Sequence, residues 1–133
     1  MDHSLSKGER LYSQKTIENL FNQGKFFFTF PVKVVYLLES GGEEPFPVQV
    51  AFSVSKKNFK RAVKRNLLKR RMREAYRLNK TGLHKAVPPG ERLSIMFIYV
   101  VKEECNYAQV EKGIKYALTQ LADISGRLAV SLC

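Results

Sequence analysis

Residues 93–101, LSIMFIYVV, constrain the fold more than any other part of the chain, because they are nearly continuous in apolar side chains. A strand with one wet face alternates apolar and polar residues, whereas a strand covered on both faces is apolar throughout. We therefore expect residues 93–101 to form a central strand. The chain has 133 residues, of which 44% are hydrophobic, enough to cover such a strand within one domain. We expect this single domain to span residues 1–133, with flexible ends at 1–12 and 125–133.

Two other stretches show the alternation of strands. Apolar residues recur at every second position in residues 32–38 and again in residues 48–54. An acidic connection rich in Gly and Pro, residues 39–47, joins them. This arrangement favours a hairpin between the two strands, with a loop longer than a tight turn.

An aromatic run, FFFTF at residues 26–30, comes before the first of these strands. Pro31 follows it directly and keeps it out of a helix, because proline lacks the backbone N–H that a helix needs. We expect most of these rings to be buried.

Helical periodicity appears near both ends of the chain. Ser13 is a candidate cap for a first helix that stops at Gly24 and has one apolar face made of Ile17, Leu20 and Phe21. Asn106 is a candidate cap for a last helix, with Gln109 at the third helical position, similar to a capping box. The last helix would bury Val110, Ile114, Ala117, Leu118 and Leu121, and Gly113 would be a weak point within it.

The positive charge of the chain is concentrated in residues 56–80, KKNFKRAVKRNLLKRRMREAYRLNK. Twelve of these 25 residues are Lys or Arg and only Glu74 is acidic, so the segment carries a net charge of +11. The whole chain is also +11, so the remainder is neutral. A protein that is neutral outside one segment has a defined binding face for a polyanion.

Residues 63–79 of this segment contain no Gly or Pro and favour a helix, which Thr81 and Gly82 would end. At about 100° per residue, an apolar arc is expected to be buried and contains Leu67, Leu68, Met72, Ala75 and Leu78. The opposite arc holds Arg65, Asn66, Lys69, Arg70, Arg73 and Arg77. Arg71 projects into the apolar arc, so its stem should lie along the core while its head reaches the edge. The alternative to a binding surface is a charged face that is simply solvated. Because this segment has a single acid, its basic side chains repel one another, which favours a bound anion.

These elements follow the order α-β-β-α-β-α, which predicts an α+β fold: a two-layer α/β sandwich with helices packed on one small sheet. Residues 48–54, the basic helix and residues 93–101 would form a βαβ unit. Physical chemistry expects a right-handed crossover in such a unit.

No catalytic constellation is evident in the sequence. The two histidines, His3 near the N-terminus and His84 in an expected loop, are expected to be exposed to solvent. The sequence contains no H-E-x-x-H, no G-x-S-x-G and no glycine loop that could cradle phosphate. Its acids are scattered, whereas a metal nuclease needs several carboxylates in one cleft. We therefore expect no catalytic residue and no metal site on the protein.

The compartment is indicated by cysteine usage and by the missing membrane signals. Cys105 and Cys133 are too few for a disulfide framework, which favours a reducing cytoplasm. No apolar run is long enough to span a bilayer, and the N-terminus lacks the apolar region of a signal peptide. We expect a cytoplasmic protein that does not bind membranes.

Charge alone leaves several kinds of polyanion binder open. A rigid helix with a lattice of cations suits a folded RNA, which proteins recognise by shape and backbone. A noncatalytic ribosomal or assembly RNA-binding protein would have the same electrostatics. A binder of a membrane surface or of another polyanion needs only the charge.

The spacing of the basic residues separates these alternatives. The stretches AFSVSKK at 51–57 and KRAVKRNLLKRRMREAYRLNK at 60–80 resemble the bacterial ribonuclease P protein subunit. The family signature consists of an Arg-Asn, a Lys-Arg and an Arg-Glu pair, which here are Arg65-Asn66, Lys69-Arg70 and Arg73-Glu74. The stretch ENLFNQGK at 18–25 resembles the first helix of the family and its terminating glycine. The resemblance covers roughly residues 9 to 124.

The resemblance implies a subunit of an endoribonuclease that cuts precursor tRNA to release the 5′ leader. It implies that an RNA subunit carries the chemistry with Mg²⁺, that the protein binds no metal of its own and needs no protein partner, and that the βαβ crossover is left-handed. The implied RNA-binding residues are Lys56, Lys57, Lys60, Arg61, Lys64, Arg65, Asn66, Lys69, Arg70, Arg73 and Arg77. The implied cleft for the leader contains Ile17, Phe21 and Tyr36, where stacking on aromatic rings tolerates any base sequence. Ile17 departs from the family, which commonly has Phe there.

Overall fold

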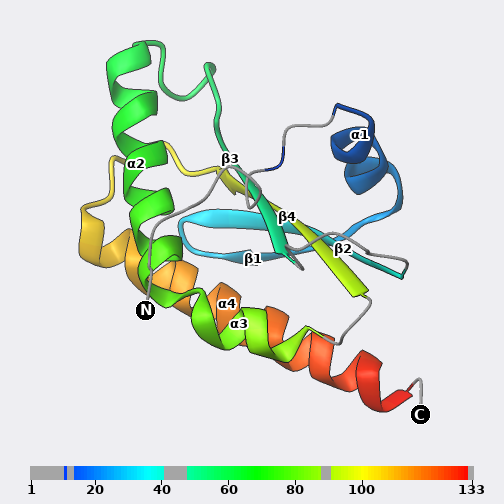
Figure 1. The fold of residues 1–133 in the computed structure, drawn as a ribbon. Helices are drawn as coiled ribbons and strands as arrows, with labels where there is room; N and C mark the ends of the chain where they lie inside the picture. The colour runs from blue at the N-terminus through cyan, green and yellow to red at the C-terminus, as the bar shows by residue number, and fades with distance from the viewer. Residues whose placement is uncertain (1–10, 12–13, 41–47, 88–90, 132–133) are drawn as a thin grey trace.

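The computed structural model describes residues 11, 14–40, 48–87 and 91–131, and its centre is a four-stranded sheet of order β1-β2-β4-β3 (Figure 1). The elements in chain order are α1 (Gln14–Gln23), β1 (Lys25–Thr29), β2 (Val32–Ser40), β3 (Val48–Val54), α2 (Ala62–Asn79), α3 (Thr81–Ala86), β4 (Glu91–Tyr99) and α4 (Tyr107–Ser131). The strand β2 is antiparallel to both β1 and β4, whereas β3 is parallel to β4. The predicted α+β class is confirmed.

The central position of β4 follows from its sequence. One face of the strand, which includes Ile95 and Phe97, is buried in the larger hydrophobic cluster, and Met96 on the other face is buried in a smaller one. An apolar strand of this kind is most stable with a neighbour on each side and cover on each face. The prediction of a central strand is therefore confirmed.

The predicted hairpin between residues 32–38 and 48–54 is wrong. The strands β2 and β3 do not pair, because β4 lies between them. The hairpin of this sheet joins β1 to β2 through the turn at Phe30 and Pro31. The strand β1, KFFFT, was not predicted because its three consecutive phenylalanines show no alternation of polarity.

The expected βαβ unit is present, since the connection from β3 to the parallel β4 passes through α2 and α3. Its hand stays a prediction. The basic helix ends at Asn79, as expected, but a short helix α3 follows where a loop was predicted, and it includes His84. The predictions for Ser13, His3 and Cys133 lie outside the described residues.

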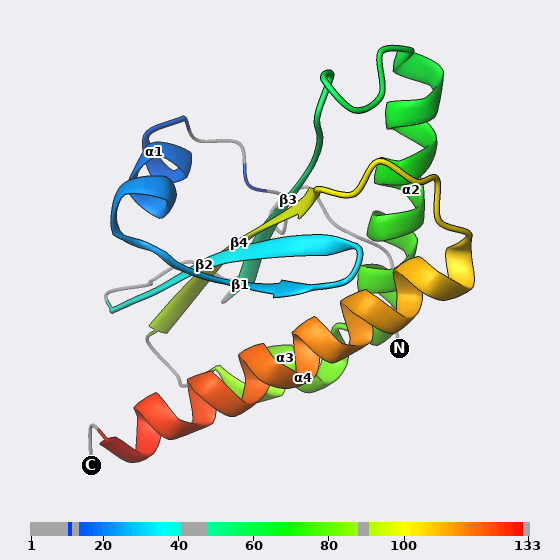
Figure 2. The same ribbon diagram turned by 180° about the vertical axis from the view of Figure 1, so that it is seen from behind.

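Helices cover the two faces of the sheet unequally. Figures 1 and 2 show α1 on one side of the sheet and α3 and α4 on the other, with α2 packed against α4. The larger cluster lies on the α4 side, whereas Ile17 and Leu20 of α1 pack over Val35 and Met96 on the other side. Because α1 has only 10 residues, part of the sheet face beside it stays open to solvent.

The helix α4 begins with the predicted capping box. The backbone N–H of Gln109 donates to Asn106 Oδ1 at 2.9 Å, and the N–H of Asn106 donates to Gln109 Oε1 at 3.0 Å. The predicted stripe is buried, and it comprises Val110, Ile114, Ala117, Leu118 and Leu121. The helix continues to Ser131, through residues expected to be a flexible tail.

Candidate nucleic-acid interface

The helix α2 is anchored by one apolar face. Leu68, Met72, Ala75 and Tyr76 are all 0% exposed. Leu67 is only half-buried and Leu78 is 43% exposed, so the buried face is rotated from the predicted one toward Tyr76. The rest of the helix circumference is left for polar side chains.

The predicted RNA-binding residues gather on α2 and on the loop before it. Most of them are exposed: Lys56, Lys57, Lys60, Arg61, Lys64, Asn66, Arg70 and Arg73. The half-buried members are Arg65, Lys69 and Arg77. Within the described part of the chain, no carboxylate pairs with Arg70 or Arg73, so both guanidinium groups are available to an external anion.

Arg65 holds the loop before α2 in place. Its Nη1 donates to the carbonyl oxygens of Phe59 and Lys60, each at 2.8 Å. Lys57 is fixed within the same loop, because its backbone N–H donates to Ser55 Oγ at 3.1 Å. These bonds keep the lysines of the loop next to the first turns of the helix, so loop and helix form one continuous basic surface.

Arg71 behaves as its position in the apolar arc predicted. Its Nη1 donates to the carbonyl oxygen of Cys105 at 2.5 Å and lies 3.7 Å from Glu104 Oε1. Glu104 also accepts a hydrogen bond from Lys64 Nζ at 2.7 Å. The pKa of the Glu104 carboxyl is held below its ordinary value of 4.5, chiefly by this hydrogen bond and further by the charges of Lys64 and Arg71. Glu104 therefore connects the segment that precedes α4 to the basic helix.

Glu74, the acid of the basic segment, pairs with Arg77 one turn along α2. The hydrogen bond from Arg77 lowers the pKa of the Glu74 carboxyl below 4.5. This pair keeps both side chains ordered on the helix surface, and it reduces the charge that Arg77 offers to an external phosphate.

The predicted leader site is not assembled as expected. Ile17 is half-buried in the cluster beneath α1, and Phe21 is 53% exposed on the same helix. Tyr36 lies on the other face of the sheet, where its ring packs on Phe27 at a centroid distance of 5.9 Å. The alternation of β2 explains this, because Val35 faces α1 and Tyr36 must then face away. Burial raises the pKa of the Tyr36 hydroxyl.

The prediction that most rings of the aromatic run are buried is wrong. Phe26 is 67% exposed and Phe28 is 58% exposed. Phe26 pairs with Val35, and Phe28 with Lys33, so both rings stand on the side of the sheet that α1 partly covers. The Nζ of Lys33 lies 4.3 Å from the centroid of the Phe26 ring, a cation–π contact.

We call Phe21, Phe26, Phe28 and Lys33 the aromatic face. Exposed rings beside a cation on an open sheet are suited to stacking unpaired bases and holding phosphate. The alternation within β1 could have predicted the shared face of Phe26 and Phe28 had β1 been recognised. Their exposure could not have been predicted, since it depends on how little of the sheet α1 covers.

The described residues contain no cluster of three His, Cys, Asp or Glu side chains that could hold a metal ion. None of the described helices is long and apolar enough to cross a membrane. Cys105 is buried and unpaired. The described residues thus present a basic surface on α2 and the loop before it, and a separate aromatic face formed by α1, β1 and β2.

Comparison with known proteins identifies a family with these features. The sequence profile of the family Ribonuclease P matches residues 5–122. The ribonuclease P protein component of Porphyromonas gingivalis is 40% identical over 119 residues, which are 89% of this chain and 86% of that protein.

Solved structures share the fold. The ribonuclease P protein from Thermotoga maritima has a TM-score of 0.64 and 25% identity, over 84% of this chain and 96% of that one. The ribonuclease P protein of Staphylococcus aureus has a TM-score of 0.65 and 19% identity, over 84% of this chain and 94% of that one. The chain therefore belongs to the bacterial ribonuclease P protein family, the protein subunits of the endoribonuclease that processes tRNA 5′ ends.

Proposed function

We propose that the basic surface of α2 holds the catalytic RNA subunit of ribonuclease P. The observation that carries this proposal is that Arg65 to Glu74, with the spacing of the family signature, lie on one helix whose other face is fully buried. Arginine forks bind phosphates bidentately, and a rigid helix fixes the distances between them. The exposed Arg70 and Arg73 make phosphate contacts, while Arg65 positions the lysines of the preceding loop.

In this proposal, the RNA subunit carries out the cleavage chemistry. Mg²⁺ would be held by that RNA, and the described protein residues do not offer a set of donors that fits the metal. What the protein supplies is cationic charge that offsets the repulsion between two RNA molecules, together with a surface that positions the substrate.

The aromatic face is the proposed binding site for the 5′ leader of precursor tRNA. A single-stranded leader would stack its bases on Phe21, Phe26 and Phe28, with Lys33 near its phosphates. Ile17 lies beneath this face and contributes apolar contact. We assign Tyr36 a supporting role from the opposite face, because its ring packs on Phe27 of β1.

A cleavage assay tests the proposed function. Purified protein, catalytic RNA and the two together are incubated with precursor tRNA and Mg²⁺ at low and moderate salt. Under moderate salt, we expect efficient cutting only by the combination, and none by the protein alone. Robust cleavage by RNA-free protein would contradict the proposal, as would an activity of the RNA that the protein does not change.

A further inference from the structure

A groove on the opposite side of the sheet from α1 has no role in the proposed function. It has a volume of about 650 Å³ and lies between the β1–β2 turn and α4. The residues of interest in its lining are Phe30, Gln109, Lys112, Lys115, Tyr116 and Thr119. We call it the α4 groove.

Two aromatic rings from different elements line the α4 groove. Phe30, in the turn, is 50% exposed, and Tyr116, on α4, is 56% exposed. A single exposed ring is ordinary on a protein surface. Two half-exposed rings around one hollow instead offer planar apolar surfaces to a flat ligand.

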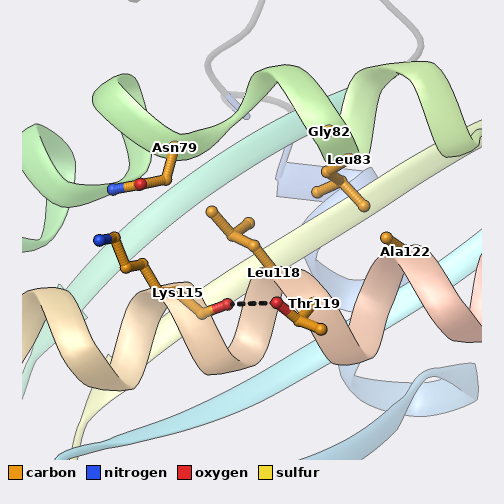
Figure 3. A pocket seen from close by; sticks show the side chains of 7 residues that line it. All are labelled: Asn79, Gly82, Leu83, Lys115, Leu118, Thr119 and Ala122. Atoms are coloured by element: carbon orange, nitrogen blue, oxygen red, sulfur yellow. Dashed lines mark hydrogen bonds between the residues drawn. The ribbon is translucent and has the colours of Figure 1, made fainter.

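The charges around the groove favour an anion. Lys112 is exposed, and no Asp or Glu is among the described residues that line the groove. Lys115 stands on the ridge between this groove and a smaller hollow of about 410 Å³ on the other flank of α4. Figure 3 shows the Lys115 side chain extending toward Asn79, across that smaller hollow. Lys112 is therefore the cation most directly placed for a ligand in the α4 groove.

The walls of the groove are held together within the protein. The close approach of α4 to the turn occurs at Gly113, where a β-carbon would lie 2.3 Å from the carbonyl oxygen of Phe30. Thr29 Oγ1 of β1 donates to the carbonyl oxygen of Gly113 of α4 at 3.4 Å, which joins the two walls. Within α4, Thr119 Oγ1 donates to the carbonyl oxygen of Lys115 at 3.0 Å. A preformed site loses less entropy on binding than one that must be ordered by its ligand.

We propose that the α4 groove binds a single-stranded segment of the catalytic RNA, with bases stacked on Tyr116 and Phe30 and a phosphate held by Lys112. The rings, the cation and the volume together match nucleotides better than an uncharged ligand. The catalytic RNA is the source because α4 packs against α2, whereas the aromatic face lies across the sheet. The inference rests on the proposed function of α2.

The test is the affinity of the full chain for the catalytic RNA, measured over a series of salt concentrations. Loss of one stacked base should weaken binding of Tyr116→Ala by about 5- to 150-fold, while Tyr116→Phe keeps the ring and should bind as the unmodified chain does. Lys112→Ala should reduce the log–log slope of the salt dependence by about 1, the change expected for the loss of one phosphate contact. Lys15→Ala removes one charge at an exposed position of α1 and should leave both the affinity and the salt slope unchanged. Melting curves confirm that each variant is folded.

The outcomes separate the groove from the proposed function. If Arg70→Ala weakens binding and Tyr116→Ala does not, the groove proposal is overturned and the role of α2 stands. If neither weakens binding, both are overturned. Equal losses in Tyr116→Ala and Tyr116→Phe would show that stacking is not the interaction. A further outcome is that the Tyr116→Ala chain binds the catalytic RNA normally while its holoenzyme loses affinity for precursor tRNA. That result would assign the groove to the substrate and would also overturn the proposal.

Discussion

Gly113 of α4 lies so close to Phe30 in the β1–β2 turn that a β-carbon on Gly113 would be 2.3 Å from the Phe30 carbonyl oxygen. Real β-carbons do not approach a backbone oxygen so closely, so any side chain larger than hydrogen must push the turn away from the helix. The glycine that weakens α4 as an isolated helix is therefore what allows α4 to pack against the sheet.

Gly113→Ala should lower the free energy of unfolding by about 1–3 kcal/mol, because the displaced atoms belong to the backbone. Gly82→Ala is the matched control, since no atom lies within 4 Å of the position of its β-carbon and Gly82 is in the helix α3. It should raise stability by up to about 1 kcal/mol, because alanine favours a helix. Chemical denaturation of both variants gives the comparison. Similar effects of the two substitutions would show that the close approach is not tight in solution.

The basic surface of α2 should bind RNA mainly through phosphate contacts. Arg70→Ala and Arg73→Ala should each weaken binding of the catalytic RNA and reduce the log–log salt slope by about 1. Leu68→Ala should instead reduce stability by about 2–5 kcal/mol, because Leu68 is 0% exposed. Filter binding at several salt concentrations measures the slopes, with Lys15→Ala as the charge control. Unchanged slopes in both arginine variants would contradict the assignment.

The aromatic face should matter only for a substrate with a leader. Phe26→Ala and Phe28→Ala should each weaken holoenzyme binding to precursor tRNA by about 1–3 kcal/mol and leave binding to mature tRNA almost unchanged. Phe27→Ala, the neighbouring substitution on the opposite face, should lower the melting temperature, because Phe27 packs against the core. The two tRNAs are compared in one binding assay. Folded Phe26 and Phe28 variants that keep the full preference for precursor tRNA would show that the leader lies elsewhere.

The supporting role of Tyr36 has a separate test. Tyr36→Ala should lower the melting temperature and reduce binding of the two tRNAs about equally, because it removes the packing of Tyr36 on Phe27. Tyr36→Phe retains the ring and should be close to the unmodified chain in both measurements. A folded Tyr36→Ala variant that loses affinity only for precursor tRNA would instead place this ring in the leader site.

Stability should depend on pH through Glu104. Its folded pKa lies below 4.5, so its stabilising contribution is complete at neutral pH and is lost as the pH falls through that lower value. Glu104→Gln should therefore melt below the unmodified chain at about pH 7, and the two melting temperatures should converge at a pH below the folded pKa of Glu104. A difference in melting temperature that is the same at both pH values would show that the pairs with Lys64 and Arg71 do not cause it.

Local patterns predicted the elements whose partners are close in sequence or whose burial is complete. The capping box at Asn106 and Gln109 requires only residues three apart. The central position of residues 93–101 follows from the absence of polar alternation. The position of the Arg71 stem could also be predicted locally. A charged side chain in the apolar arc of a helix lowers its energy by extending toward the edge of that arc.

Relations between distant segments were not predictable in the same way. The alternation of β2 shows that Val35 and Tyr36 face opposite sides, but nothing within β2 indicates which side α1 covers. Resemblance to the family grouped Tyr36 with Ile17 and Phe21, although the sheet separates them. The choice of β4 over β3 as the neighbour of β2 likewise depends on competition among strands, which a hairpin rule based on proximity in sequence does not include.

The parallel pairing of β3 with β4 links folding of the sheet to the charge on α2. These two strands can meet only after the chain between them, which includes α2, has folded back across the sheet. In the RNA-free protein, the like charges of α2 repel one another and oppose that step. On the proposed function, RNA bound to the folded α2 would act as a ligand that stabilises the native chain. Assembly with the RNA and completion of the protein's own sheet would then be coupled equilibria.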